Sequence, residues 1–116
     1  MAFDWNQYID VGRELCSKKE QKYIRAGISR AYYGLYNKLR LHKGLTTRYR
    51  PHKELIDKLL LAEIFEEEAD LSFYLQQLKK FREESDYDGI QVVDERYSKD
   101  FWLRFDTALE IFEKNK

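Results

Sequence analysis

Residues 24–39 of the chain read IRAGISRAYYGLYNKL, and apolar residues recur in this stretch at every third or fourth position. The repeat forms a stripe of Ile24, Ile28, Ala31, Leu35 and Leu39. This spacing matches one face of an α-helix, in which 3.6 residues complete a turn. Ser17 and Glu20 have the form of a capping box, which predicts the start of the helix, and Gly44 is a natural C-terminal stop. The sequence therefore predicts a helix of about 25 residues, roughly 37 Å long.

The residues on either side of this helix carry two more helical patterns. Asp4 is a suitable N-terminal cap for a first helix that ends near Cys16, because its carboxylate can accept a free backbone N–H. Residues 45–50 have the composition of a loop, and Pro51 suits the first turn of the next helix. The apolar repeat extends that helix to Ile64.

The rest of the chain predicts two further helices and the turn between them. Residues 66–70, EEEAD, interrupt the apolar repeat, which resumes on a helix over residues 71–81. Residues 85–89, SDYDG, are typical of a turn, and residues 90–93 could be extended but have no second strand to pair with. Asp94 is a natural cap for the last helix. We expect an all-α, antiparallel bundle of four to five helices that forms one domain over residues 1–116.

The distribution of charge is more informative than its total. The 116 residues include 21 Lys and Arg against 21 Asp and Glu, so the formal net charge is zero. Residues 1–62 hold 13 basic and 6 acidic side chains, whereas residues 63–116 hold 8 basic and 15 acidic ones. No acidic residue lies between Glu20 and Glu54, although nine Lys or Arg do. Because the basic residues are concentrated in the first half, a net charge of zero does not exclude a surface that binds a polyanion.

Several classes of protein are excluded by the composition. The chain has a single cysteine, Cys16, which excludes an internal disulfide and a cysteine-rich zinc site. His42 and His52 are its two histidines, and we expect no metal and no other cofactor. The first residues lack the features of a signal peptide, and no apolar run approaches the roughly 20 residues that span a membrane. These features predict a cytoplasmic protein that does not contact the membrane.

The long helix interleaves basic and aromatic residues. One face carries Arg25, Ser29, Tyr32, Tyr36, Arg40 and Lys43, and the neighbouring face carries Arg30, Tyr33 and Asn37. Basic side chains can neutralise phosphates and tyrosine rings can stack on bases, as in sites for single-stranded nucleic acid. We therefore expect an RNA-binding surface formed by Arg30, Tyr33, Asn37 and Arg40. The same pattern also fits tyrosines in the core and charges paired with the acidic half.

A second candidate site lies in residues 78–88, LKKFREESDYD. Arg82 follows Leu78 by one helical turn, which places it at the inward edge of the helix. An inward arginine needs a partner, and the carboxylates that follow it could supply one. This pattern fits either a functional arginine or a structural ion pair.

Three of these segments together resemble a known family. Residues 29–36, SRAYYGLY, resemble the SRAYYA helix of small prokaryotic HEPN-domain proteins. His52-Lys53 and residues 78–88 resemble the H-K and L-x-x-x-R-x-x-A-D-Y-D segments of the same group, and the likeness spans about residues 5–112. The resemblance implies a helical bundle that forms a homodimer, in which the two Arg-bearing helix ends meet in a composite cleft. Many HEPN proteins are metal-independent endoribonucleases of toxin–antitoxin, CRISPR or phage-defence systems.

The resemblance also implies roles for individual residues. The nuclease signature is an arginine followed, after four to six residues, by a histidine; the arginine holds the scissile phosphate and the histidine helps to transfer the 2′-hydroxyl proton. In this chain Arg82 is followed after four residues by Tyr87. The expected catalytic set is therefore Arg82, which contacts phosphate, with Tyr87 and Asp86, which shape the site. A tyrosine, with an ordinary pKa of about 10, is a poor general base near neutral pH.

Several alternatives remain open from the sequence. Tyr87 could orient water or RNA, act with a depressed pKa, or accept a modification. His42 or His52 could replace the missing imidazole, or could serve in packing or capping. The protein could instead be a catalytically inactive interaction module that pairs with a nucleotidyltransferase antitoxin or a larger defence complex.

Overall fold

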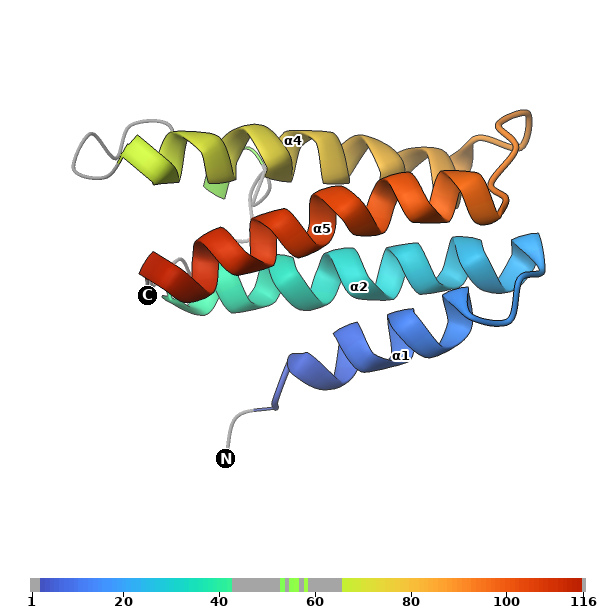
Figure 1. Cartoon of the computed structure of the whole chain (residues 1–116), viewed down its shortest axis with the longest axis horizontal. Helices are drawn as coiled ribbons and strands as arrows, with labels where there is room; N and C mark the ends of the chain where they lie inside the picture. Colours follow the sequence, from blue (N-terminus) through green and yellow to red (C-terminus); the bar gives the residue numbers. More distant parts are fainter. Residues whose placement is uncertain (1–2, 43–52, 54, 57, 59–65, 116) are drawn as a thin grey trace.

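The computed structural model describes residues 3–42, 53, 55–56, 58 and 66–115 of the chain (Figure 1). Four helices carry the fold: α1 (Asn6–Cys16), α2 (Gln21–His42), α4 (Glu66–Tyr87) and α5 (Glu95–Asn115). Lys53, Leu55, Ile56 and Lys58, between α2 and α4, are also helical. The described part of the chain contains no strand, so the predicted all-α class is confirmed.

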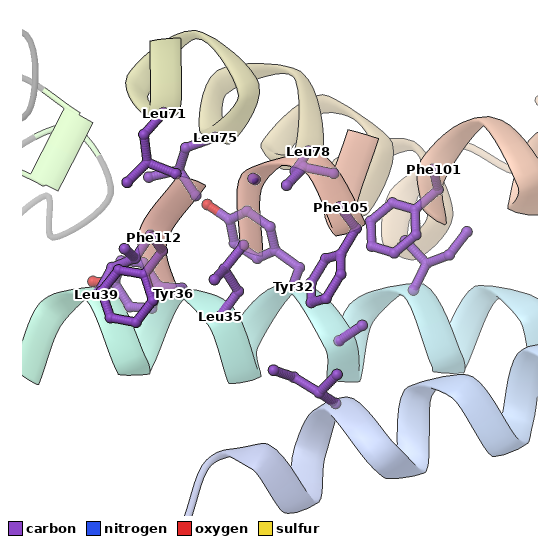
Figure 2. Packing of buried hydrophobic residues seen from close by; sticks show 14 of the residues in the cluster. Tyr32, Leu35, Tyr36, Leu39, Leu71, Leu75, Leu78, Phe101, Phe105 and Phe112 are labelled. Carbon is purple, nitrogen blue, oxygen red and sulfur yellow. The ribbon is translucent and has the colours of Figure 1, made fainter. Parts of the chain in front are cut away.

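The helices form two antiparallel pairs that pack on each other, α1 with α2 and α4 with α5 (Figure 1). Helix α2 contacts all three of the other helices. Its predicted apolar stripe is confirmed, because Ile24, Ile28, Ala31, Leu35 and Leu39 are all fully buried. Leucines of α4 and phenylalanines of α5 pack over this stripe (Figure 2).

Of the three predicted N-terminal caps, Asp94 is confirmed, whereas Trp5 rather than Asp4 lies at the N-cap of α1. The Asp94 carboxylate accepts the Tyr97 backbone N–H at 3.0 Å at the start of α5, and the Asp4 carboxylate accepts that of Asn6 at 3.0 Å. The prediction of a capping box at Ser17 and Glu20 is wrong. The Ser17 hydroxyl instead donates to the Glu14 carbonyl at 2.6 Å, at the end of α1. Lys19 then adopts a left-handed backbone, with φ 68°, and turns the chain into α2.

The predicted limits of α4 are too narrow at both ends. Residues 66–70, which interrupt the apolar repeat, are helical and form the start of α4. At the other end Ser85, Asp86 and Tyr87 are helical rather than part of a turn. Ser85 is buried there, so packing outweighs its turn propensity. Gly44, the loop 45–50 and most of the helix predicted from Pro51 lie outside the described residues.

Helices α1 and α2 approach each other closely where glycines face each other. A Cβ added at Gly12 would lie 2.7 Å from the Gly27 carbonyl oxygen and 2.8 Å from the Ala31 Cβ. Added at Gly27, it would lie 2.7 Å from both the Gly12 carbonyl oxygen and the Cys16 sulfur. Because backbone atoms are among these neighbours, the space cannot be made by a side-chain rotation. The two glycines set the separation of α1 and α2.

We expect Gly12→Ala to lower the free energy of unfolding by about 1–3 kcal/mol, because the overlap with the α2 backbone exceeds the helix-propensity gain of about 1 kcal/mol. Gly89→Ala is the control, since a Cβ there meets no atom within 4 Å and φ lies outside the left-handed region. It should leave the protein as stable or about 0.4–1 kcal/mol more stable. Urea unfolding measures both variants, and equal effects at the two positions would contradict the close approach.

Candidate functional site

Arg82 of α4 lies at the centre of a group of aromatic and acidic side chains, here called the Arg82 cluster: Arg82, Tyr32, Tyr33, Asp86 and Tyr87. The Arg82 guanidinium carbon lies 5.6 Å from the Tyr32 ring centroid, 5.3 Å from that of Tyr33 and 5.7 Å from that of Tyr87. These distances are within the range of cation–π attraction. The structure therefore brings all three residues of the predicted catalytic set together with Tyr33.

The inward arginine has the ionic partner that its position requires. Arg82 is only 6% exposed, and its Nη1 donates to Asp86 Oδ2 at 3.5 Å, one helical turn along α4. Burial by itself lowers the pKa of Arg82, but the electrostatic influence of Tyr33, Tyr32 and Asp86 prevails and raises it. The guanidinium therefore remains charged inside the cluster. The structural ion pair that the sequence left open is present.

The tyrosines of the cluster differ in their access to solvent. Tyr32 is fully buried, and burial raises its pKa well above the ordinary value, which keeps the phenol neutral. Its ring belongs to the core, below α4 and α5 (Figure 2). Tyr33 is half-buried, whereas Tyr87 is 77% exposed. The surface of the cluster that a ligand can reach therefore consists of Tyr33, Asp86 and Tyr87.

The four residues predicted to bind RNA fall into two groups. Tyr33, Asn37 and Arg40 form a connected row along α2: Asn37 Nδ2 donates to the Tyr33 carbonyl at 2.8 Å, and Arg40 Nη2 donates to Asn37 Oδ1 at 3.3 Å. Arg30 contacts α1, because its Nη1 donates to the Tyr8 hydroxyl at 3.5 Å and its guanidinium lies 5.3 Å from the Tyr8 ring centroid. The structure thus shows a second arginine–tyrosine pair, which joins α2 to α1.

Arg25 of α2, which the sequence places on the basic face, is an anchor for the end of α4. Its Nη1 donates to the carbonyls of Glu84 and Ser85 at 3.1 and 3.0 Å, and its Nη2 donates to the Gln91 carbonyl at 2.5 Å. The Ser85 carbonyl belongs to the last turn of α4, where carbonyls lack a partner within the helix, whereas the Glu84 carbonyl also accepts the Asp88 backbone N–H at 3.0 Å. No local pattern indicates this role, since its partners lie 59–66 residues away in the sequence.

His42 lies at the end of α2, away from the Arg82 cluster of the same chain. It lies nine residues beyond Tyr33 on α2, about 13 Å along the helix axis. There its ring packs edge-on against Phe112, with centroids 5.4 Å apart, which fits the packing role. His52 lies outside the described residues. Within the described ranges, no group of three or more His, Cys, Asp or Glu is placed to hold a metal ion.

A groove of about 1080 Å³ is lined by α4, by the helical residues Lys53 and Ile56, and by the connection after α4. Its lining includes Lys53, Ile56, Lys79, Lys80, Glu83, Tyr87 and Ile90. Its charges are mixed, and Tyr87 is the residue that it shares with the Arg82 cluster. None of the helices that the structure describes is long and apolar enough to cross a membrane.

Comparison with known proteins adds no assignment, because no family model, curated protein or solved structure matches the chain. The likeness to HEPN proteins therefore rests on the three sequence segments quoted above.

We expect Arg25→Met to lower the free energy of unfolding by about 2–4 kcal/mol, because it leaves the carbonyls of Glu84, Ser85 and Gln91 without their charged donor. Arg96→Ala, which removes an exposed arginine of α5, should change stability by no more than about 0.5 kcal/mol. Chemical unfolding of both variants tests this expectation. A similar small effect at the two positions would show that Arg25 is not an anchor.

Proposed function

We propose that the protein is an RNA- or nucleotide-binding protein of the HEPN type, which serves a toxin–antitoxin or phage-defence system as a homodimer. The observation that carries the proposal is the Arg82 cluster. There a charged guanidinium lies against tyrosine rings, and one of these rings, Tyr87, is 77% exposed. An exposed aromatic face beside a cation is the arrangement that binds single-stranded nucleic acid without sequence specificity.

The row on α2 extends this surface. Tyr33 contacts Arg82, and Asn37 and Arg40 follow it along the helix. The Arg30–Tyr8 pair provides another cation beside an aromatic ring. A single strand of RNA that stacks on Tyr87 and Tyr33 has Arg40 and Arg30 available for its phosphates.

The proposed homodimer places two Arg82 clusters close to one two-fold axis. The end of α4 and the connection after it support this arrangement, because Tyr87, Ile90 and Val92 are exposed there. In this proposal the two copies enclose a composite cleft that binds one RNA strand.

We expect Tyr87→Ala to weaken the binding of single-stranded RNA by about 1–3 kcal/mol, the usual contribution of one stacked base. The melting temperature should be nearly unchanged, because the ring is exposed. Phe73→Ala is the matched control: Phe73 is an exposed aromatic residue of the same helix, 57% exposed and about 21 Å from Tyr87 along the axis. Fluorescence anisotropy with a labelled oligonucleotide measures both, and equal losses would count against a site at Tyr87.

The nuclease form of the proposal is tested separately. Labelled RNA is incubated with the purified protein in EDTA, with Arg82→Lys and Arg82→Ala as variants. Metal-independent cleavage by the wild type that falls at least about tenfold in both variants is the expected result, because phosphate stabilisation in the transition state accounts for effects of that size. An uncleaved RNA, or equal cleavage by the variants, would limit the function to binding.

A second candidate function is an interaction module that pairs with a nucleotidyltransferase or a larger defence complex. It is favoured by the burial of Arg82, which is only 6% exposed and already paired with Asp86. Ile90 is 94% exposed and Val92 60% exposed, which suits a protein contact. Affinity purification with mass spectrometry distinguishes the two functions. A stoichiometric protein partner without RNA supports the module, and bound RNA supports the leading proposal.

A further inference from the structure

We propose that Arg82 and Ser29 form a binding site for a phosphate group, and that the Asp86 carboxylate fills this site when no ligand is bound. Phosphate then binds by exchange with Asp86. The inference rests on the proposed function and states how a buried Arg82 becomes available to RNA. In this inference Asp86 competes with the phosphate for Arg82 and Ser29.

The order of the side chains from the interior to the surface supports this exchange. The Arg82 side chain is 7% exposed, whereas that of its partner Asp86 is 26% exposed. Asp86 therefore lies on the solvent side of the ion pair. The Ser29 hydroxyl of α2 donates to the same carboxylate oxygen, Oδ2, at 3.2 Å. Two donors from two helices thus converge on one anionic oxygen, and phosphate oxygens accept from the same kinds of donor.

The hydrogen bonds that Asp86 accepts do not use the full donor capacity of Arg82. Arg82 Nη1 lies 3.5 Å from the carboxylate oxygen, whereas charge-assisted N–H···O bonds are usually about 2.7–2.9 Å long. Arg82 Nε is buried without a hydrogen-bond partner among the residues that the structure describes. A phosphate group has more acceptor oxygens than one carboxylate and can bind a guanidinium through two bonds. It therefore offers Arg82 a better set of acceptors than Asp86 does.

In this proposal the exchange is a movement of the Asp86 side chain. Asp86 is the penultimate residue of α4, and the neighbouring backbone is held by Arg25, which binds the Glu84 and Ser85 carbonyls. The Asp86 side chain can rotate toward solvent about its own χ1 while this backbone stays in place. Arg82 and Ser29 then remain in position for the incoming phosphate.

The test compares Asp86→Asn with Glu83→Gln. Both variants remove one negative charge from the exposed side of the same helix, but Glu83 pairs with Lys79 at 3.9 Å and not with Arg82. Two probes are used: a single-stranded oligouridylate and inorganic phosphate. We expect Asp86→Asn to bind each probe about fivefold more tightly than Glu83→Gln does, because a neutral amide competes less well for a guanidinium.

Each outcome shows whether Asp86 competes with phosphate for Arg82 or is only a structural partner of Arg82. Equal affinities for the two variants, or weaker binding by Asp86→Asn, overturn the inference while RNA binding by the wild type still supports the proposed function. If no protein binds the oligouridylate, the proposed function fails. The phosphate arm then decides the inference alone, and only tighter phosphate binding by Asp86→Asn supports it. Asp86→Ser, checked for native helicity by circular dichroism, serves as a second variant and should also bind phosphate more tightly than Glu83→Gln.

Discussion

The interaction on which the rest of the site depends is the contact of Arg25 with three backbone carbonyls. A single guanidinium from α2 binds the end of α4, at Glu84 and Ser85, and the connection to α5, at Gln91. The same region receives a second bond from α2, because Gln21 Oε1 accepts the Val93 backbone N–H at 3.2 Å. Charged donors on neutral carbonyls contribute more than ordinary hydrogen bonds. They fix both the rotation and the ending of α4 relative to α2.

The position of the Arg82 cluster follows from this constraint. Arg82 and Asp86 are one turn apart on α4, and Tyr33 and Ser29 are one turn apart on α2, so their contacts exist only while the two helices keep one register. Tyr32 extends the contact into the core, where it is fully buried. The Arg82 cluster therefore lies at the outer edge of the hydrophobic core, and its geometry depends on the packing beneath it.

The sequence predicts the features that a local pattern encodes. The apolar stripe of α2 and the cap at Asp94 depend on residues within a few positions of each other, and both are confirmed. Residues 85–87 have turn chemistry that distant contacts override, whereas Ser17 forms a local bond to the Glu14 carbonyl instead of capping α2. The pairing of Arg82 with a carboxylate one turn away could be read from the spacing, because it lies within one helix. Arg25 could not be identified, since its carbonyl partners carry no sequence signal.

The contacts in the structure show how much of the basic stretch is already paired. The acid-free stretch suggests a bare basic surface, but several of its cations already have partners: Arg25 binds backbone carbonyls, and Lys38 pairs with Glu113 at 2.8 Å. Arg82 is likewise paired with Asp86. A phosphate that binds at Arg82 displaces the Asp86 carboxylate, which becomes a free negative charge and attracts a counterion. The net release of counterions at Arg82 is therefore smaller than at an unpaired surface cation. Because the salt dependence of nucleic-acid binding reflects the net release of counterions, it should depend on exposed cations such as Arg30 more than on Arg82.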